Sequence, residues 1–494
     1  MSSDYPKCQK CIQRLLASIR GATPWVVLSI VGLVTTTANA ADERFEMIVL
    51  GDSQSYLTNN GQFAANFQSQ VDWIRDNKQL RNIKFISHVG DLVEHPDTLA
   101  EWNLASDALA VLDQADIANA VAFGNHESTT GSPGNPPPQV GATNYLDYFG
   151  ADRYSGHTWF GGASPTGLSS WQRINAGGGH FLHVNLEYDA PDAALEWAQS
   201  VLDMPGNQGL PTVVTTHVYL NDNRGIFNNG NKTTVLRQTS PYDSSDPSRN
   251  SAETIFNEFI SANDQIFLTL NGHVQGERLL VSKNDAGSDV YQMQVDYSRR
   301  PNGGDGWTRI LTFDVNRHQI RVSTYSPVLD DHQQVEPSNY LGRDDSPYNE
   351  PVDHYTGPGD TQADGDAEYV ITLDFFDRFG LGHETALPFG DLNEDGVIDA
   401  GDWSVFSENH LSDMSALNLG QTYLRGDLDE DGDNDEVDYQ LFKTLYEQAN
   451  GPNSLERIST TVPEPMGAIL WGIGGAAYLA QRHLSTRSQA AERR

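Results

Sequence analysis

The chain has 494 residues, of which 67 are acidic and 31 basic, and its formal net charge at pH 7 is −36. A chain of this length can bury a large core without cross-links. So acidic a surface disfavours nucleic acid as a binding partner, because two polyanions repel each other. Its only cysteines, Cys8 and Cys11, lie near the N-terminus. Removal of that segment would exclude thiol catalysis and thiolate zinc sites.

The N-terminal segment has the pattern of a secretory signal. Basic residues precede an apolar run from Trp25 to Val34, and the small-residue motif Ala38-Asn39-Ala40 follows it. The run is shorter than the ~20 residues that span a bilayer. A cleaved signal peptide over residues 1–40 is therefore favoured over a transmembrane anchor.

Residues 44–327 alternate between strand-like and helix-like patterns. The apolar runs 45–50 and 83–89 predict strands, and the amphipathic stretch 63–77 between them predicts a helix. This alternation is typical of an α/β core.

Polar stretches interrupt and follow this core. Residues 128–145 and 221–251, rich in Gly, Pro, Asn and Ser, are expected to be loops around a site. Residues 328–385 are acidic and dotted with proline, which predicts a linker or irregular extension. Within that range, the apolar run at 370–376 predicts a return to a strand.

Five apolar runs each end in a side chain suited to metal coordination. One such ending means little, because Asp and Asn are ordinary turn residues, but five in one chain are much harder to attribute to turns. Carboxylates, amide oxygens and imidazoles are ligands for Mg, Mn, Fe or Zn, and strand ends project into a shared crevice. The candidate ligands are Asp52, Asp91, Asn125, His217 and His273.

The motifs that contain these residues resemble those of the calcineurin-like metallophosphoesterases. The resemblance covers about residues 44–327 and is carried by Asp52-Ser53-Gln54, GDLVE at 90–94, GNHE at 124–127, Thr216-His217 and GHVQ at 272–275. A subgroup of secreted bacterial members shares the D-(S/T)-Q opening. The resemblance implies a four-layer αββα fold, in which two mixed sheets are flanked by helices, and the hydrolysis of a phosphate mono- or diester.

The resemblance also implies a role for each matched residue. Asp91 would bridge two divalent cations (Mn, Mg, Fe or Zn), which together bind a phosphoryl oxygen and generate hydroxide near neutral pH. His126 would donate a proton to the leaving group. One cation would be completed by Asn125, His217 and His273, and the other would be held by Asp52, Gln54 and Gln275.

Gln54 and Gln275 depart from the family pattern, which has histidine at both positions. Both replacements fall in the same metal site. An amide oxygen is a weaker and harder donor than imidazole, so this site is expected to prefer Mg, Ca or Mn, or to stand empty with reduced or lost activity. The alternative function is therefore that of a non-catalytic, calcium-dependent surface or matrix protein on the same scaffold.

The Gly-Asp-Ser sequence at 51–53 has a second interpretation. In one class of serine esterases the serine of such a turn is the nucleophile, activated by a histidine that an aspartate orients. Those enzymes carry a late Asp-x-x-His, whereas none of the 14 histidines here follows an aspartate at that spacing. Asp52 is therefore favoured over Ser53 as the working residue.

Residues 292–314 resemble a closing β-hairpin of the same subgroup. Its candidate substrate contacts are Arg299, Arg300 and Asp305. A plain hairpin with a Gly-rich turn is the alternative.

Two acidic segments, 390–402 and 426–438, repeat at an offset of 36 residues. Each matches a calcium loop with oxygen ligands at positions 1, 3, 5, 9 and 12 and a glycine at position 6. Calcium is expected to fold this region, because its carboxylates would otherwise repel one another. The predicted calcium ligands are Asp391, Asn393, Asp395, Asp399 and Asp402 in the first loop and Asp427, Asp429, Asp431, Asp435 and Asp438 in the second.

The repeat region, residues 386–452, resembles a type I dockerin, an α-helical EF-hand-like module. The resemblance implies a cohesin-like or matrix partner, although the spacing of 36 residues is longer than the usual dockerin pattern. A solvated acidic spacer is the alternative.

The C-terminal segment 462–487 has a Pro-Glu-Pro sequence, a short apolar run and then basic residues. It resembles the PEP-CTERM sorting signals of diderm bacteria, which a membrane protease recognises and removes, and an ordinary transmembrane anchor is the alternative. The resemblance implies transient membrane contact and a final location outside the cell or at its outer envelope. Together these patterns predict a secreted metallophosphoesterase.

Overall fold

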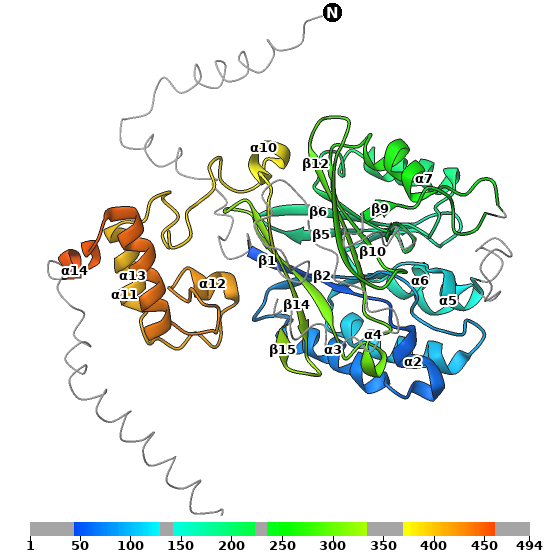
Figure 1. The fold of residues 1–494 in the computed structure, drawn as a ribbon, viewed down its shortest axis with the longest axis horizontal. Coiled ribbons are helices and arrows are strands. Elements are labelled where there is room, and N and C mark those ends of the chain that lie inside the picture. The colour runs from blue at the N-terminus through cyan, green and yellow to red at the C-terminus, as the bar shows by residue number, and fades with distance from the viewer. Residues whose placement is uncertain (1–43, 129–141, 223–234, 245, 333–368, 460–494) are drawn as a thin grey trace, which may run out of the picture. The chain divides into compact units, whose positions relative to one another are not determined.

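The computed structural model describes residues 44–128, 142–222, 235–244, 246–332 and 369–459 (Figure 1). The predicted signal peptide and sorting signal lie outside these residues, as does most of the predicted linker. Among the helices in the described ranges, none is both long enough and apolar enough to cross a membrane.

Two seven-stranded mixed sheets form the core. The first has the order β15-β14-β13-β1-β2-β3, with β16 beside β14, and the second has the order β11-β12-β10-β7-β6-β5-β4. The strands of the first sheet are β1 Arg44–Leu50, β2 Ile83–His88, β3 Ala118–Val121, β13 Thr308–Asp314, β14 Gln319–Ser326, β15 Asp331–His332 and β16 Tyr369–Thr372. Those of the second are β4 Phe160–Ala163, β5 Ser170–Ala176, β6 Gly179–Asn185, β7 Thr212–Thr215, β10 Ile266–Asn271, β11 Gly276–Lys283 and β12 Asp289–Asp296. Strands β8 Leu220–Asp222 and β9 Val235–Arg237 form a separate ribbon.

Helices cover the outer faces of the two sheets. The helices before residue 380 are α2 Gln54–Gly61, α3 Ala64–Asn77, α4 Leu99–Gln114, α5 Thr143–Phe149, α6 Ala151–Tyr154, α7 Asp192–Leu202, α8 Ala252–Ile255 and α10 Phe375–Phe379. Short 3-10 helices span Asn125–Glu127 and Pro301–Gly303, and a π-helix spans Phe256–Ile260.

Three hydrophobic clusters define four layers. The first lies between the two sheets, where Phe45 and Phe313 of the first sheet pack with Phe267 of the second. The second joins the first sheet to α2, α3, α4 and α5, and the third joins the second sheet to α7 and α8. All of β1 is buried, as expected of a strand covered on both faces. The observed layers therefore run helices, sheet, sheet, helices.

The local predictions for this core agree with the structure in most places. The run 45–50 lies in β1, 83–88 is β2, and the helical stretch 63–77 is α3 from Ala64 onward. The run at 370–376 is a strand only to Thr372, where β16 ends, and α10 begins at Phe375. The described parts of the two expected loops contain α5 and β9.

The predicted hairpin at 292–314 is wrong. Strand β12 pairs with β10 and β11 in the second sheet, whereas β13 pairs with β1 and β14 in the first. The segment between them crosses from one sheet to the other. Within it, the Arg300 guanidinium lies over the rings of Tyr297 and Trp307, at 4.9 and 5.8 Å. The local pattern resembles a hairpin because two strands flank a Gly-rich turn, but each strand has its own partners.

A buried ion pair links the two sheets. Arg309 on β13 and Glu277 on β11 lie 2.8 Å apart, and neither side chain is exposed. Tyr297 donates its hydroxyl to the Glu277 carboxylate at 2.5 Å, and Thr324 on β14 donates at 2.8 Å. Because one carboxylate receives groups from both sheets, this network fixes their separation.

The C-terminal repeat region has a small core of its own. Its helices are α11 Ala400–Asn409, α12 Leu419–Tyr423, α13 Glu436–Asn450 and α14 Ser454–Ser459. Each acidic loop leads directly into a helix, α11 after the first and α13 after the second. The core residues are Leu392, Phe406, Tyr423, Leu428, Phe442, Tyr446 and Leu455.

Candidate metal centre

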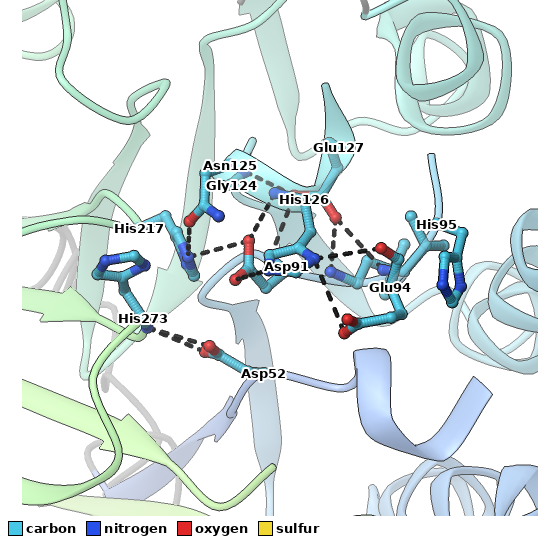
Figure 2. Close-up of polar contacts among 12 residues, drawn as sticks. Asp52, Asp91, Glu94, His95, Gly124, Asn125, His126, Glu127, His217 and His273 are labelled. Atoms are coloured by element: carbon cyan, nitrogen blue, oxygen red, sulfur yellow. Dashed lines mark hydrogen bonds and ion pairs between the residues drawn. The ribbon is translucent and has the colours of Figure 1, made fainter. Parts of the chain in front are cut away.

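The five predicted ligands all follow strands that run in the same direction within their sheets. Strands β1, β2 and β3 are parallel, as are β7 and β10. Their carboxyl ends therefore meet at one edge of the two-sheet core. Figure 2 shows the side chains that follow these ends gathered around one carboxylate, that of Asp91. The loops carry Asp52, Asp91, Asn125, His217 and His273.

Asp91, His217 and His273 offer ligand atoms that all lie within 4.8 Å of one another. With Asn125 we call these residues the strand-end cluster. The His217 Nε2 atom is 3.0 Å from Asp91 Oδ1 and 3.1 Å from Asn125 Oδ1. On the other side of the ring, Nδ1 lies 2.9 Å from the carbonyl of Val89. That contact orients the imidazole so that Nε2 faces the cluster, as the outer hydrogen bonds of metal-ligating histidines do.

The charges of the cluster are balanced internally. Burial opposes ionisation of Asp91 and His217, yet their contact holds the pKa of Asp91 below, and the pKa of His217 above, the ordinary values. Burial lowers the pKa of His273 to about 3, so this ring is neutral at physiological pH. A neutral imidazole and an ionised carboxylate are the forms that bind metal, and a cation would displace the proton shared with His217.

Backbone geometry at the cluster depends on glycine and on left-handed residues. Asp91 and His273 have φ of 49° and 71°, a conformation that costs of order 1–3 kcal/mol for residues other than glycine. A Cβ on Gly124 would lie 2.4 Å from Asp91 Oδ1, and one on Gly272 would lie 2.0 Å from Asp52 Oδ1. Glycine is therefore required at both positions for the backbone to approach the carboxylates.

Asp52 is buried beside the cluster, and no Lys or Arg in the described part of the chain forms an ion pair with it. Its two carboxylate oxygens accept the backbone N–H of His273, at 3.1 and 3.3 Å. Burial and then the carboxylates of Asp296 and Asp91 raise its pKa well above the ordinary value. A buried acid among other acids is destabilising unless a positive charge joins it.

The two glutamines carry buried amide atoms that lack partners. Gln54 begins α2, and its backbone N–H donates to the Asp91 carbonyl at 3.0 Å. The Gln54 Oε1 and Gln275 Nε2 atoms are both buried, without a hydrogen-bond partner among the described residues. Buried polar atoms rarely remain unpaired, and an amide can be turned to present its oxygen. Together with Asp52 and Asp91, these residues fit a divalent cation.

His126 lies at the opening of the cluster. Its Nε2 is 3.9 Å from Asp91 Oδ2, its Nδ1 is 3.2 Å from the Glu94 carbonyl, and a third of its side chain is exposed. Burial opposes protonation, but the carboxylates of Asp91 and Glu94 raise the pKa of His126 above its ordinary value. This position and charge suit a group that donates a proton to a substrate oxygen.

Glu127, which the sequence analysis treated only as the last letter of GNHE, organises two of the loops. Its buried carboxylate accepts the backbone N–H of Gly124 at 2.6 Å, of Leu92 at 2.6 Å and of Asp91 at 3.1 Å. Burial, together with the Asp91 carboxylate, raises its pKa to about 7. Glu127 therefore fixes the loops after β2 and β3 to each other and sets the position of Asp91.

Ser53 is not arranged as a nucleophile. It is 1% exposed, and its hydroxyl donates to the carbonyl of Leu92 at 3.1 Å. The Nε2 of His88 lies 2.9 Å from the same hydroxyl, and its Nδ1 accepts the backbone N–H of Gly90 at 3.2 Å. The Nε2 atom of His88 therefore carries the proton and donates it to the Ser53 hydroxyl. It cannot act as a base that takes a proton from Ser53. The sequence gives no sign of this contact, because His88 lies inside a strand.

Two further residues near the cluster were not predicted. The ring of Tyr242 lies 4.8 Å from that of His273. Asp296 is buried at the end of β12. A sequence signal for Asp296 does exist, since it follows the strand-like run 290–295 just as the other acids follow their strands.

The two acidic loops share one arrangement. Gly396 and Gly432 have φ of 91° and 98°, and the last carboxylate of each loop accepts backbone N–H groups from its beginning: Asp402 from Leu392 at 2.7 Å and Asp438 from Leu428 at 2.6 Å. In the second loop, ligand atoms of Asp427, Asp429 and Asp438 lie within 4.8 Å of one another, as do those of Asp431, Asp433 and Asp438. Within the described ranges, the Oδ1 atom of Asp427 is buried without a hydrogen-bond partner, which fits a hard cation.

Comparisons with known proteins add little to this geometry. No protein-family model matches the chain. The uncharacterised protein YvnB of Bacillus subtilis strain 168 is 25% identical over 311 residues, which are 62% of this chain and 22% of YvnB. The match therefore spans about a fifth of that longer relative.

Solved structures with similar arrangements include a purple acid phosphatase, PPD1, from seeds of yellow lupin (Lupinus luteus), with 12% identity, TM-score 0.39, and coverage of 59% of this chain and 53% of that one. GAP50, the anchor in the inner membrane complex of Plasmodium, has 13% identity and TM-score 0.34, covering 59% and 87%. A predicted phosphoesterase from Streptococcus pneumoniae TIGR4 has 9% identity and TM-score 0.23, covering 57% and 90%. At these values the similarities carry no argument about chemistry, which rests on the residues themselves.

Proposed function

We propose that the protein is a metal-dependent phosphoesterase that hydrolyses a phosphate mono- or diester. The observation that carries this proposal is the strand-end cluster, in which a buried carboxylate, an amide and two imidazoles from separate loops converge on one point. These residue types in a buried site are the ligands of divalent transition metals or Mg.

Each residue has a distinct part in the proposed reaction. Bound divalent cations supply Lewis-acid chemistry, polarising the phosphoryl group and lowering the pKa of water. Asn125, His217 and His273 would hold one cation and Asp52, Gln54 and Gln275 would hold the other, with Asp91 as a ligand to both. His126, held by contacts to Asp91 and Glu94, donates a proton to the leaving oxygen.

Turnover of p-nitrophenyl phosphate and bis-p-nitrophenyl phosphate tests the proposal. The full chain is assayed with Mn, Mg, Ca or Zn added, beside the variant Asp91→Asn. Metal-dependent turnover that the variant lacks is expected. Absence of turnover with every metal, or equal turnover by the variant, contradicts the proposed activity.

The second candidate is a non-catalytic protein on the same scaffold, and the glutamine pair is the observation that favours it. If the site with Gln54 and Gln275 stays empty, only one cation remains. Metal content of the purified chain, compared with a variant in which both glutamines are changed to histidine, separates the two functions. One ion in the metal centre of the wild type, and a second ion there only in the histidine variant, would favour a non-catalytic binding role.

We further propose that the two acidic loops bind calcium through the ten ligands predicted above and that this region docks to a cohesin-like or matrix partner. The repeated loop geometry and the unpaired Oδ1 of Asp427 support the calcium part of this proposal. Calorimetric titration with CaCl₂ is expected to give two sites per chain. A chain that takes up no calcium would contradict it.

Export is a proposal that rests on sequence alone. We expect cleavage after Ala40, transient membrane contact through residues 462–487, and release outside the cell or at the outer envelope. Amino-terminal sequencing of the protein recovered from culture medium is expected to begin at Ala41. Retention of the full chain in the cytoplasm would contradict this route.

A further inference from the structure

Asp296 lies at the same edge of the core as the strand-end cluster. Strand β12, which it ends, runs parallel to β10, and Gln294 pairs with Asn271. Asp296 stands two residues beyond Gln294, at the end of β12, and His273 lies in the loop that follows Asn271 at the end of β10. On its other side, Asp296 pairs with Gly276 of β11, the residue that follows Gln275. Asp296 thus ends a strand that lies between β10, which leads to His273, and β11, which follows Gln275.

The loop that carries Asp52 packs directly against this position. A Cβ on Gly51 would lie 3.4 Å from the carbonyl oxygen of Val295 and 3.6 Å from the Cα of Asp296. The end of β1, in the first sheet, therefore packs against the end of β12, in the second. Among the charged neighbours of Asp52, the Asp296 carboxylate has the largest effect on its pKa.

Asp296 is buried without a cation to balance it. It is 4% exposed, and its Oδ1 accepts the backbone N–H of Ser298 at 2.8 Å. Within the described ranges, no Lys or Arg forms an ion pair with Asp296 or Asp52, and the charged groups that affect Asp296 most are Asp91 and His217. Two buried acids facing a third are unfavourable in an apolar core unless a cation binds among them.

A second observation points to a ligand at the same place. Gln54 is 8% exposed, its backbone N–H donates to the Asp91 carbonyl, and its Oε1 has no hydrogen-bond partner among the residues that the structure describes. Gln275, one residue before the partner of Asp296, also has an unpaired buried amide atom. A hard divalent cation would be bound by the unpaired Oε1 of Gln54, by the Gln275 amide turned to present its oxygen, and by the unbalanced carboxylates.

We propose that Asp296 is a metal ligand and that, with Asp52, Gln54, Gln275 and the shared Asp91, it forms an oxygen-donor site for a hard cation such as Mn²⁺ or Mg²⁺. The proposal rests on the proposed function, because it assigns the second cation of that site. Three carboxylates supply the negative charge, and the amides complete a set of hard oxygen donors. This set takes the place of the two imidazoles that the family pattern has where Gln54 and Gln275 stand. The site would then have an altered metal preference rather than a lost function.

Titration of metal-free full-length protein with MnCl₂, followed by electron paramagnetic resonance of free Mn²⁺, tests the proposal. The variant Asp296→Asn keeps an oxygen for the Ser298 N–H but lowers the charge. The matched control Asp289→Asn makes the same change at the other end of β12, where the carboxylate pairs with Lys283. Mn²⁺ bound by the acidic loops contributes equally to all variants.

Asp296→Asn is expected to lose one Mn²⁺ per chain, or to bind it at least about tenfold more weakly, while Asp289→Asn matches the wild type. The melting temperature of metal-free Asp296→Asn is expected to equal or exceed that of the metal-free wild type, because a repulsion between buried carboxylates is removed. Wild-type Mn²⁺ binding by Asp296→Asn overturns the proposal. A lower metal-free melting temperature with unchanged binding assigns Asp296 a purely structural role and also overturns it.

Asp91→Asn, measured in parallel, separates this inference from the proposed function. If Asp91→Asn binds as many ions as the wild type, the whole metal centre is wrong. If only Asp91→Asn loses ions, the centre stands and the role of Asp296 falls. Should Asp296→Asn fail to fold, anomalous diffraction from Mn²⁺-loaded wild-type crystals decides: a peak at the Asp296 carboxylate supports the proposal, and a cluster peak without one overturns it.

Discussion

The strand-end cluster and the two acidic loops both gather carboxylates, and they differ in what holds those groups in place. In the cluster, Asp91 is paired with an imidazole and fixed through Glu127, and its loop follows a fully packed strand. In the loops, the carboxylates accept backbone N–H groups of their own segment, and neither 391–402 nor 427–438 contains a Lys or Arg.

This difference shows two ways of preparing a cation site. Two large sheets hold the loops of the cluster, so an ion bound there would serve the proposed reaction rather than folding. The loops belong to a small core, and a small core supplies little stability. An ion bound there would contribute to folding itself. Metal removal should therefore abolish activity in one region and loosen the structure of the other.

Asp91→Asn should break the first half of this comparison most severely. The variant is expected to lose roughly 10³-fold or more in kcat, because the shared carboxylate is removed from the site. Asn accepts the left-handed backbone at this position, so the variant is expected to fold, with some loss of stability because the contact between Asp91 and His217 is weakened. Asp116→Asn is the matched control, because Asp116 has the same φ of 49° but lies on the surface. Equal kcat for both variants would contradict the assignment.

Arg309→Met should test whether the sheets prepare the cluster. Removing this guanidinium leaves Glu277 buried without its cation, which is expected to cost about 3–5 kcal/mol in the free energy of unfolding. Urea unfolding followed by tryptophan fluorescence measures the change. Arg75→Met, which removes an exposed ion pair with Asp72, should cost at most about 1 kcal/mol. Similar losses for both would show that the inter-sheet pair is unimportant.

Calcium removal should sharpen the second half of the comparison. At calcium concentrations near 100 times Kd, binding stabilises a site by about 2.7 kcal/mol, so chelation with EGTA should make α11 and α13 sensitive to protease. The same change is expected for Asp427→Asn in calcium. Asp413→Asn, outside both loops, should digest like the wild type. Protease resistance that is indifferent to EGTA would remove the distinction between the regions.

The pH dependence of stability near the cluster should show a smaller effect, through Asp189. Burial raises the pKa of its carboxyl to about 6. The backbone N–H of Asp243, which donates to this carboxyl at 2.7 Å, opposes the rise only in part. A raised folded-state pKa stabilises the protein below the unfolded value and loses that contribution as pH rises through about 6. Between pH 4 and pH 6, the wild type should lose about 1–2 kcal/mol in its free energy of unfolding through this group, and Asp189→Asn should not show that loss. Thermal unfolding across this range measures it, and identical slopes would contradict the expectation.

Much of the cluster could be predicted because its signals are local. A polar residue directly after an apolar strand is visible in the sequence, and parallel strands bring such endings to one edge. Asp52, Asp91, Asn125, His217 and His273 all obey this rule. Asp296 obeys it as well, but Gln292 and Gln294 interrupt the apolar run before it, so the strand resembled half of a surface hairpin.

The features that escaped prediction depend on pairings between distant segments. The crossover after β12 is invisible locally, because nothing in the Gly-rich turn records which sheet each flanking strand will join. The Glu277–Arg309 ion pair and the contact between His88 and Ser53 likewise join separate strands or loops. Such pairings are set by the packing of the whole core rather than by any periodic pattern.

The left-handed backbone at Asp91 and His273 has a consequence for how this protein changes over time. Glycine would relieve the torsional cost at both positions, so selection for heat tolerance alone would remove these side chains. A descendant that retains them keeps a torsional cost that glycine would not carry. A left-handed backbone alone does not mark function, since Asp116 has the same φ on the surface, but related chains that keep both side chains together would be the ones expected to retain the proposed site.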